Sequence, residues 1–395
     1  MGCCCKKRKE YAQCIKEDGK GKELEEKNPS KNNYEIIKSI GKGAFGEVFL
    51  VRLKSDKTQY FAMKKLKKEK FKKISKLVRN ERDVGTYVKS PFVISIIKAF
   101  QDTENLYLVS EYVRGKDLYY YWKKKNKKFS LSLTRFYIVE LILALEDLHE
   151  QNIVHRDIKL ENILLDEKGH IKLTDFGLSK ILKDDDNTNT MVGTPTYIAP
   201  EVFNKVGHNK TADWWSVGCL MFAMLEGRFP FTFDYNYYQR RLEKINYKKE
   251  IEFKIIKDKD KDSINAKDLI LKFLVMNPKN RLGAGENGIN NIKSHAFFEG
   301  FNWVSARKQK LDPPLKPKIE NIEEVKGRFD ELLVNDDIDK NDKNYYRGFS
   351  FEADSGKNTS DLKNDNNDND NNNDNNNEKL LDKENNESSD KQLLD

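Results

Sequence analysis

Residues 153–177 read IVHRDIKLENILLDEKGHIKLTDFG, and this stretch decides the fold. An apolar segment runs into HRDIKLEN, and a second segment with alternating apolar residues, HIKLT, runs into DFG, so both have the pattern of short strands. They deliver two carboxylates, Asp157 and Asp175, with Asn162 between them. Phosphoryl transfer requires such a set, because one aspartate orients a hydroxyl group while a second acid and an amide hold Mg²⁺ against the phosphates.

The alternative interpretation is that these residues only form turns, which is the commonest role of Asp and Asn in loops. Here, however, HRDxKxxN and DFG occur in order, and each follows directly on a strand-like segment. Motif and context together support such an assignment, so the stretch predicts a phosphoryl-transfer centre.

The composition limits the class of protein. The 395 residues are enough for two domains or for one large domain of two lobes. Four of the five cysteines lie within the first fourteen residues, which is no disulfide framework and fits a reducing cytosol. No apolar run approaches the length needed to span a bilayer.

The net charge of +8 is divided unequally: residues 352–395 carry thirteen acids and five lysines, a net −8, which leaves +16 for residues 1–351. A basic body can indicate nucleic-acid binding, but the sequence contains no groove-reading helix or aromatic RNA-binding motif. We therefore expect no nucleic acid, and we attribute the excess to a solvated surface attracted to anionic membranes or phosphorylated partners.

The amino terminus, MGCCCKKRK, has the pattern of a lipid-modified segment. Gly2 is a candidate for N-myristoylation, and Cys3, Cys4 and Cys5 are candidates for S-palmitoylation, although position 6 is Lys where the usual pattern has Ser or Thr. Because one myristoyl chain binds membranes only weakly, anchoring needs a second chain or a basic patch, and this terminus offers both. We expect a cytoplasmic protein attached to the anionic inner surface of a membrane; the alternative is a disordered basic end whose cysteines bind a metal or are incidental.

Glycines join the first two of three strands expected over residues 34–53 and 59–66. The joining sequence, GKGAFG, lets backbone amides approach phosphate oxygens. GxGxxG also occurs in dinucleotide-binding sites, but there it opens a helix, whereas here it continues into the strand EVFLV. The pattern predicts a hairpin that covers a nucleotide.

The strands of this hairpin supply further candidates. Val48 and Ala62 are placed to press against adenine, and Lys64 to reach the α and β phosphates as a point charge. A lysine on a strand is usually solvated, but a helical segment, KKISKLVRNERDV, follows this one, and its Glu81 is placed to pair with Lys64. Formation of such a pair switches enzymes of this kind on.

Together, GKGAFGEV, FAMKKL, NERDV, HRDIKLEN, DFG and the later APE resemble the eukaryotic protein kinase family over Tyr34 to about Phe298. SPFVISIIKAFQDTENLYLVSEYVRGKDL and DFGLSK are similar to the AGC group. The resemblance implies an α+β fold of two lobes, a small mainly β lobe with one key helix and a larger mainly α lobe. It divides the chain into a lipid-modified terminus and linker (1–31), a kinase domain (34–298), an AGC C-terminal extension (299–355) and a disordered Asn/Asp-rich tail (356–395).

The resemblance also implies an ATP site. The backbone at Glu111 and Val113 would bind the adenine edge, Leu164 would form the floor, and Asp117 would meet the ribose or a basic substrate side chain. Ser110 occupies the gatekeeper position, where a small side chain should open a pocket behind the adenine. The residues predicted to bind ATP are Ile40, Gly41, Lys42, Gly43, Ala44, Phe45, Gly46, Glu47, Val48, Ala62, Lys64, Ser110, Glu111, Val113, Asp117 and Leu164.

The catalytic roles follow from the same resemblance. Asp157 would orient the substrate hydroxyl, Lys159 would neutralise charge on the transferred phosphate, and Asn162 and Asp175 would bind Mg²⁺. The catalytic set is completed by Lys64 and Glu81. In structural roles, Asp213 would brace the catalytic loop, Arg281 would pair with Glu201, and a helix with amphipathic spacing over residues 135–149 would pack in the core.

Thr190 matches the activation-loop phosphorylation site of the AGC group, and Arg156 with Lys180 would pair with its phosphate. Two positions depart from the family pattern. Leu77 stands where a helix histidine usually contacts this phosphate, and Gly85 where a large apolar side chain usually packs behind the DFG phenylalanine. We expect looser coupling to the helix, and low basal activity or reliance on another element.

For substrates, Asp117 and Glu161 match acids that recognise arginine upstream of the phosphorylated residue, while a further acid is replaced by Ala223. The resemblance places Thr194 close to Asp157 and Lys159, and this threonine, with LEN after Lys159, favours Ser/Thr acceptors over Tyr. The predicted partners are basic protein segments and an upstream activating kinase.

After LDPPLKPKI, whose prolines fix an extended path, YYRGFSFE resembles the AGC hydrophobic motif around a phosphorylated Ser350. The alternative is a sticky surface patch. The sequence thus predicts a lipid-anchored Ser/Thr kinase; a membrane-bound scaffold with a kinase fold, and an enzyme acting on small-molecule hydroxyls, are the alternatives.

Overall fold

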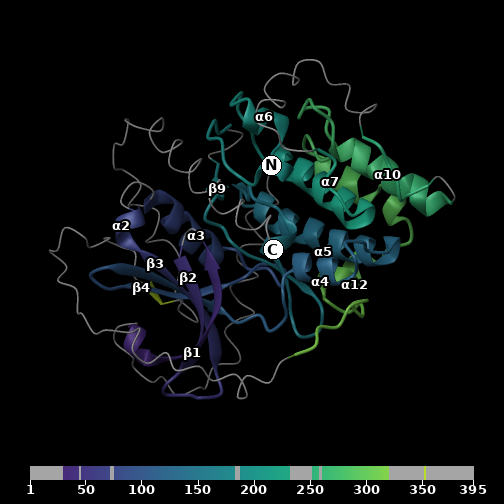
Figure 1. The fold of residues 1–395 in the computed structure, drawn as a ribbon. Coiled ribbons are helices and arrows are strands. Elements are labelled where there is room, and N and C mark those ends of the chain that lie inside the picture. Colours follow the sequence, from purple (N-terminus) through teal and green to yellow (C-terminus); the bar gives the residue numbers. More distant parts are fainter. Residues whose placement is uncertain are drawn as a thin grey trace, which may run out of the picture.

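The computed structural model describes residues 30–43, 46–71, 75–182, 187–231, 251–257, 260–319 and 351–352, with the backbone alone for residues 43, 70–71, 75–77 and 351–352. These residues form a smaller lobe built on a β-sheet and a larger helical lobe, and the catalytic stretch lies where the lobes meet (Figure 1). The two-lobed α+β fold is therefore confirmed. No helix of this part of the chain is long and apolar enough to cross a bilayer.

The smaller lobe is an antiparallel sheet in the order β1-β2-β3-β5-β4-β10. Its strands are β1 Tyr34–Gly43, β2 Gly46–Leu53, β3 Tyr60–Lys67, β4 Ile96–Gln101, β5 Asn105–Glu111 and β10 Phe351–Glu352. Helices α2 (Lys68–Phe71) and α3 (Ser75–Tyr87) follow β3. Alternate residues point to opposite faces of a strand. Phe100 therefore packs with Tyr34 and Tyr107 on one face, while its neighbour Ala99 packs with Val78 of α3 on the other.

The folded part of the chain begins before Tyr34. Lys31, which the sequence placed at the end of a linker, is buried, and its Nζ donates to Asp102 at 2.9 Å. The hydroxyl of Tyr107 donates to the same carboxylate at 2.7 Å. Although burial opposes it, these hydrogen bonds lower the pKa of Asp102 below its ordinary value. A buried charged pair ties this end of the linker to the sheet.

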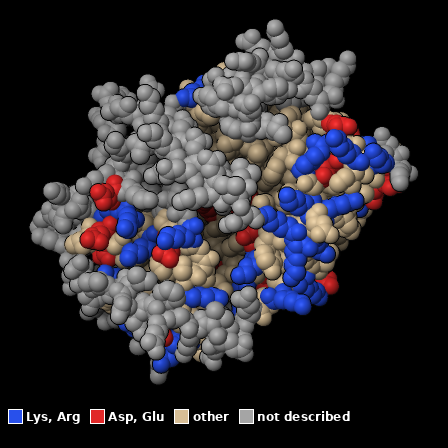
Figure 2. All heavy atoms as spheres, viewed as in Figure 1, with Lys and Arg blue, Asp and Glu red and all other residues tan. Residues whose placement is uncertain are grey.

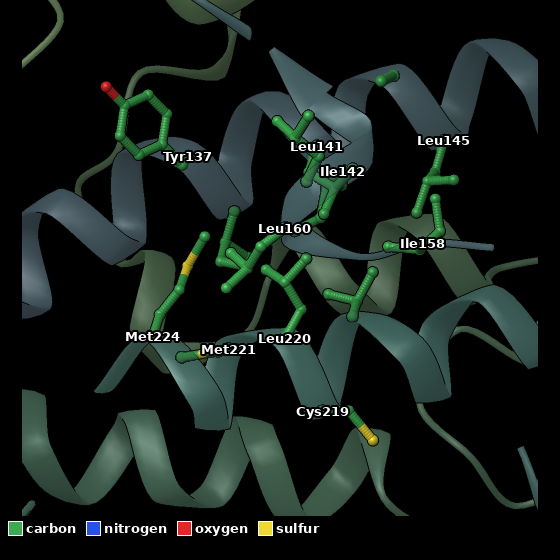
Figure 3. Close-up of a cluster of buried hydrophobic side chains, with 14 of the residues drawn as sticks. Tyr137, Leu141, Ile142, Leu145, Ile158, Leu160, Cys219, Leu220, Met221 and Met224 are labelled. Carbon is green, nitrogen blue, oxygen red and sulfur yellow. The ribbon is translucent and has the colours of Figure 1, made fainter. Parts of the chain in front are cut away.

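The larger lobe is built from helices around one core. They are α4 Leu118–Lys124, α5 Leu131–His149, α6 Pro200–Phe203, α7 Thr211–Glu226, α10 Lys261–Phe273, α11 Gly288–Lys293 and α12 Trp303–Arg307. Figure 3 shows Leu141 and Leu145 of α5 facing Leu220 of α7, with Ile158 and Leu160 of the catalytic loop between the helices. The catalytic loop is thus held in place by its apolar side chains, which are packed into the core of the larger lobe.

Helix α5 differs from the amphipathic helix expected over residues 135–149. It begins at Leu131, because the side chain of Ser130 accepts a hydrogen bond from the amide of Leu133 and caps the helix. It is also buried on nearly every side, since α7, α10, α12 and β8 all contact it. Even Glu140 is buried, where its carboxylate lies 2.6 Å from His170 Nδ1.

Two short hairpins carry the motifs of residues 153–177. Strand β6 (Ile153–Val154) pairs with β9 (Lys180–Ile181), and β7 (Ile163–Leu165) pairs with β8 (Ile171–Leu173). The two strand-like segments of the sequence are therefore real, and each ends two or three residues before its carboxylate.

After α12, residues 308–319 of the C-terminal extension lie along this region without helix or strand, as the prolines predict. At the turn of the β7–β8 hairpin, Gly169 has a φ of 100°, and a Cβ there would lie 2.1 Å from the carbonyl oxygen of Leu315. Only glycine permits so close an approach.

Candidate active site

A cavity of about 670 Å³ opens between the lobes. Twelve of the sixteen predicted ATP-binding residues line it: Ile40, Gly41, Lys42, Gly46, Val48, Ala62, Lys64, Ser110, Glu111, Val113, Asp117 and Leu164. Ala44 and Phe45 lie outside the described residues, and the backbone of Gly43 ends β1. Glu47 is placed differently, because its carboxylate accepts a hydrogen bond from Ser39 on the hairpin instead of lining the cavity.

Lys64 pairs with Glu81 as the sequence predicted. Its Nζ donates to the two carboxylate oxygens of Glu81 at 2.8 and 2.9 Å, and it lies 3.4 Å from Asp175 Oδ1. Burial acts to lower the pKa of Lys64, but the two carboxylates outweigh it and raise the pKa above its ordinary value. Burial likewise acts to raise the pKa of Asp175, but the charges of Lys64 and Lys159 lower it. Asp175 is therefore ionised.

Asp157 is held by three neighbours. Asn162 Nδ2 donates to Asp157 Oδ2 at 2.9 Å, Lys159 Nζ lies 2.9 Å from the same oxygen, and Thr194 Oγ1 donates to Oδ1 at 2.7 Å. Lys159 also donates to Thr194 Oγ1 at 2.9 Å. The catalytic carboxylate is thus fixed in one orientation before any substrate arrives.

Asp213 braces the loop that carries Asp157, as predicted. Its carboxylate accepts hydrogen bonds from the backbone amides of His155 and Arg156 at 3.0 and 2.9 Å. Arg156 has a φ of 68°, a left-handed conformation that costs on the order of 1 kcal/mol outside glycine. These two bonds hold it there. The predicted pair of Arg281 and Glu201 is also present, buried and bidentate at 2.6 and 2.8 Å.

Asn162 and Asp175 fit a Mg²⁺ ion. Both line the cavity, and both offer oxygen, the atom that Mg²⁺ prefers. Because Asn162 donates through Nδ2 to Asp157, its amide oxygen is the atom left for a metal. Asp175 is ionised, and its side chain is 35% exposed. Within the described residues there is no cluster of three His, Cys, Asp or Glu side chains that would compete for the ion.

Ser110 and Gly85 shape the back of the site. Ser110 lines the cavity together with Ile94, Ile96 and Phe176, and it pairs with Ile96 across β5 and β4. A Cβ on Gly85 would lie 2.3 Å from Ile96 Cγ1, so α3 and β4 are in direct contact where the family pattern has a large helix side chain. Ile96 fills that space, and Gly85 leaves no gap. The side chain of Leu77, the other departure, is outside the described part of the chain.

The acids expected to read the substrate both lie in the cavity lining. Asp117 caps α4 by accepting from the amide of Tyr120 at 2.7 Å. Glu161 Oε2 is buried without a hydrogen-bond partner among the described residues. Burial raises the pKa of both carboxyls above the ordinary value. A cation bound beside them would offset the free-energy cost of burying the two charged carboxylates.

The activation loop shows what the sequence missed. Lys180 Nζ donates to Thr188 Oγ1 at 2.8 Å, and Arg156 Nε donates to the carbonyl of Leu178 at 2.6 Å. Thr190 is partly exposed. The strand bridge between Thr188 and His208 brings a buried histidine to this loop. No motif marks His208, because only the folded chain places it there.

Two parts of the C-terminal extension reach the smaller lobe and the cleft. Lys318 lines the cavity, which the sequence did not predict, although the prolines before it gave the signal of an extended path. The backbone of Phe351 and Glu352 pairs with Ala99 and Lys98 of β4. Ser350 lies outside the described residues.

Comparisons with known proteins agree with this geometry. The family model described as "Protein kinase domain" matches residues 34–298. Ribosomal protein S6 kinase beta of Caenorhabditis elegans is 39% identical over 341 residues, which cover 82% of this chain and 60% of that protein. Ribosomal protein S6 kinase alpha-2 of Mus musculus is 39% identical over 365 residues, 86% of this chain and 48% of that protein.

The cAMP-dependent protein kinase catalytic subunit 3 of Drosophila melanogaster is 38% identical over 325 residues, 80% of this chain and 54% of that protein. The chain thus spans about half the length of these relatives. The matched kinase domain covers both lobes and every catalytic motif described above, so the chain belongs to the eukaryotic protein kinase family, in its AGC group of serine/threonine kinases.

Proposed function

We propose that this chain is a serine/threonine protein kinase that transfers the γ-phosphate of ATP, with Mg²⁺, to protein segments rich in basic residues. The observation that carries the proposal is the fixed orientation of Asp157, whose partners Asn162 and Thr194 line a cleft in which Lys64 is already paired with Glu81. Positioning and electrostatic stabilisation supply nearly all the catalysis in phosphoryl transfer.

Each residue has a separate task. Asp157 orients the acceptor hydroxyl and takes up its proton, and Lys159 offsets the charge of the phosphate in transit. Lys64 holds the α and β phosphates, with its charge secured by Glu81. Mg²⁺, bound by Asn162 and Asp175, would neutralise charge on the phosphate oxygens.

The substrate proposal rests on Glu161. Its Oε2 is buried and unsatisfied, which is costly unless a cation binds, and Asp117 adds a second negative charge to the same cavity wall. An arginine three residues before the acceptor meets this requirement, because its guanidinium forms strong charge-assisted hydrogen bonds with carboxylates. Thr194, bonded to both Asp157 and Lys159, supports Ser or Thr as the acceptor.

A peptide assay tests both parts. Two peptides differ only in Arg or Ala three residues before the acceptor Ser, and phosphorylation is measured with Mg·ATP. We expect kcat/KM to be roughly 10-fold or more higher for the Arg peptide, the size of one charge-assisted bond. Glu161→Gln should bring the ratio toward one, whereas Glu167→Gln, at an exposed acid of the next turn, should leave it unchanged.

Equal rates on the two peptides would refute the proposed preference for basic substrates. Rates no higher than those of Asp157→Ala would refute the kinase activity itself and favour the alternative of a membrane-bound scaffold with a kinase fold.

We propose further that the protein is anchored to the cytoplasmic face of a membrane through acylation at Gly2 and at Cys3 to Cys5. The basic surface of the larger lobe supports this proposal. Figure 2 shows Lys and Arg side chains gathered over the region of α4 and α5, and five of six residues from 123 to 128 are exposed lysines. Each such charge adds about 1 kcal/mol near an anionic surface.

Fractionation of cells tests the anchor. Gly2→Ala should move the protein from the membrane to the soluble fraction, while Ala12→Gly, a control outside the acylation pattern, should not. Unchanged partitioning of the Gly2 variant would exclude myristoyl anchoring.

We also propose regulation by an upstream kinase at Thr190 and by phosphorylation of Ser350. Ser350 comes directly before strand β10, on the edge of the sheet in the smaller lobe.

A further inference from the structure

His208 and Thr188 are paired side by side in the larger lobe. The amide of Thr188 donates to the carbonyl of His208 at 2.9 Å, and the amide of His208 donates back to the carbonyl of Thr188 at 2.9 Å. Residues paired directly across two strands project their side chains to the same side. Since Lys180 Nζ donates to Thr188 Oγ1, the side chains of Lys180, Thr188 and His208 share one side of the activation loop.

Thr190 follows two residues after Thr188, in a segment without helix. Side chains two residues apart in extended chain point the same way. A Cβ on Gly207 would lie 3.2 Å from Asn187 and 3.2 Å from Asn189, so these two side chains share one side and the chain alternates here as an extended segment does. The same alternation puts Thr190 on the side of Thr188 and His208.

His208 is buried, with 2% of its surface exposed, and neither ring nitrogen has a hydrogen-bond partner in the part of the chain that the structure describes. Arg156 is 8% exposed, and its Nη1 is likewise buried without a described partner. A buried polar group without a partner costs about 1–3 kcal/mol. Two such side chains beside one loop indicate that a ligand is missing between them.

The charges around His208 define the kind of ligand. Burial, with the nearby cations Arg156 and Lys180, lowers the pKa of His208 to about 3, against a weaker opposing effect of Asp213. Asp213 is engaged by His149 and by the catalytic-loop amides. The acids Asp184 to Asp186 lie outside the described residues. Two cations and two buried polar side chains without a described partner, with one carboxylate that is already engaged, call for an anion.

We propose that His208 is a ligand of the phosphate on Thr190, in place of the helix histidine that is Leu77 in this chain. The inference rests on the proposed phosphorylation of Thr190. The phosphate accepts hydrogen bonds from Arg156, Lys180 and one ring nitrogen of His208. Its negative charge also offsets the positive charges of Arg156 and Lys180 near the imidazole. Phosphorylation therefore raises the affinity of His208 for a proton.

The test uses full-length protein with phosphothreonine installed at position 190 by amber suppression and verified by mass spectrometry, so that no upstream kinase or kinase activity is required. The ³¹P resonance of the phosphate is followed against pH. His208 lowers the titration midpoint by donating to the dianion. We expect the midpoint to rise by about one pH unit in His208→Phe and in His208→Gln, as for loss of a neighbouring partner.

His295→Gln is the matched control, because His295 contacts Asp268 of α10 instead of the activation loop, and it should leave the midpoint unchanged. A midpoint that does not move in either folded His208 variant overturns the proposal. A second measurement needs no variant: the ¹⁵N shifts of the His208 ring are titrated with and without the phosphate. An unchanged histidine titration overturns the proposal as well, and neither result depends on the peptide assay.

Discussion

Replacement of Gly85 by alanine tests how α3 is held against the sheet. A methyl group at this position would lie 2.3 Å from Ile96 Cγ1 and 3.1 Å from Ile96 Cβ. Neither atom is the free end of a flexible chain, and χ1 of a β-branched residue is stiff, so α3 and β4 must separate. In an exposed helix the same substitution stabilises by about 1 kcal/mol. Here overpacking costs about 1–3 kcal/mol, and we expect net destabilisation of up to about 2 kcal/mol.

The separation should also reach the active site. Gly85 lies one turn after Glu81, on the same face of α3. A shift of the helix therefore carries the Glu81 carboxylate away from Lys64, whose hydrogen bonds are 2.8 and 2.9 Å long. Misplacement by about 1 Å lowers catalytic rates by roughly 100-fold, so activity should fall more than stability does.

Urea unfolding and the peptide assay measure the two effects. Ile96→Ala removes the obstructing Cγ1, and the double variant should recover part of what the single variants lose. The expected coupling is about 1 kcal/mol, within the range for residues in contact. A Gly85→Ala protein that is more stable than the parent, with unchanged kcat/KM, would show that the contact with Ile96 is not a constraint.

Three other changes have defined outcomes. Ser110→Met should abolish inhibition by purine analogues with a bulky substituent, and equal inhibition before and after would refute the pocket behind the adenine. Arg281→Met, which strands the buried Glu201 carboxylate, should cost about 3–5 kcal/mol in urea unfolding, whereas Lys261→Met at an exposed pair should leave the midpoint unchanged. The pKa of His208 is lowered to about 3 in the folded protein, so below about pH 6.5 only the unfolded chain takes up a proton at this histidine. The free energy of unfolding of the unphosphorylated protein should therefore fall by about 1.4 kcal/mol for each pH unit below about 6.5. His208→Phe should make this pH dependence less steep.

The sequence predicted those active-site residues whose chemical role allows only one type of side chain. Asp157, Asn162 and Lys64 occur in motifs where no other residue type would serve. Asn162 and Lys64 line one cleft, and Asp157 is hydrogen-bonded to Asn162 beside it. The pair of Arg281 and Glu201, which are 80 positions apart, was predicted instead from the resemblance to the kinase family. The resemblance therefore carried information about a distant contact that no local pattern gives.

Other features depend on packing between segments that no local pattern records. The all-round burial of α5 follows from helices that arrive later in the chain, and the contact of Gly85 with Ile96 follows from the approach of α3 to β4. Lys318 reaches the cleft only because the extension folds back on the β7–β8 hairpin. Glu47 has the right position in its motif, but its carboxylate accepts a hydrogen bond from Ser39 and does not line the cavity.

The two departures from the family pattern alter how a phosphate on Thr190 would act. With Leu77 in α3, the helix lacks the histidine that usually receives this signal, while Arg156 connects directly to the catalytic stretch. Its amide is held by Asp213, its Nε by the carbonyl of Leu178 just after DFG, and the next residue is Asp157. A phosphate that fixes the Arg156 guanidinium would therefore align both catalytic acids without moving α3. Because the pair of Lys64 and Glu81 is already formed, we expect phosphorylation in this chain to order residues 155–178 more than it repositions the helix.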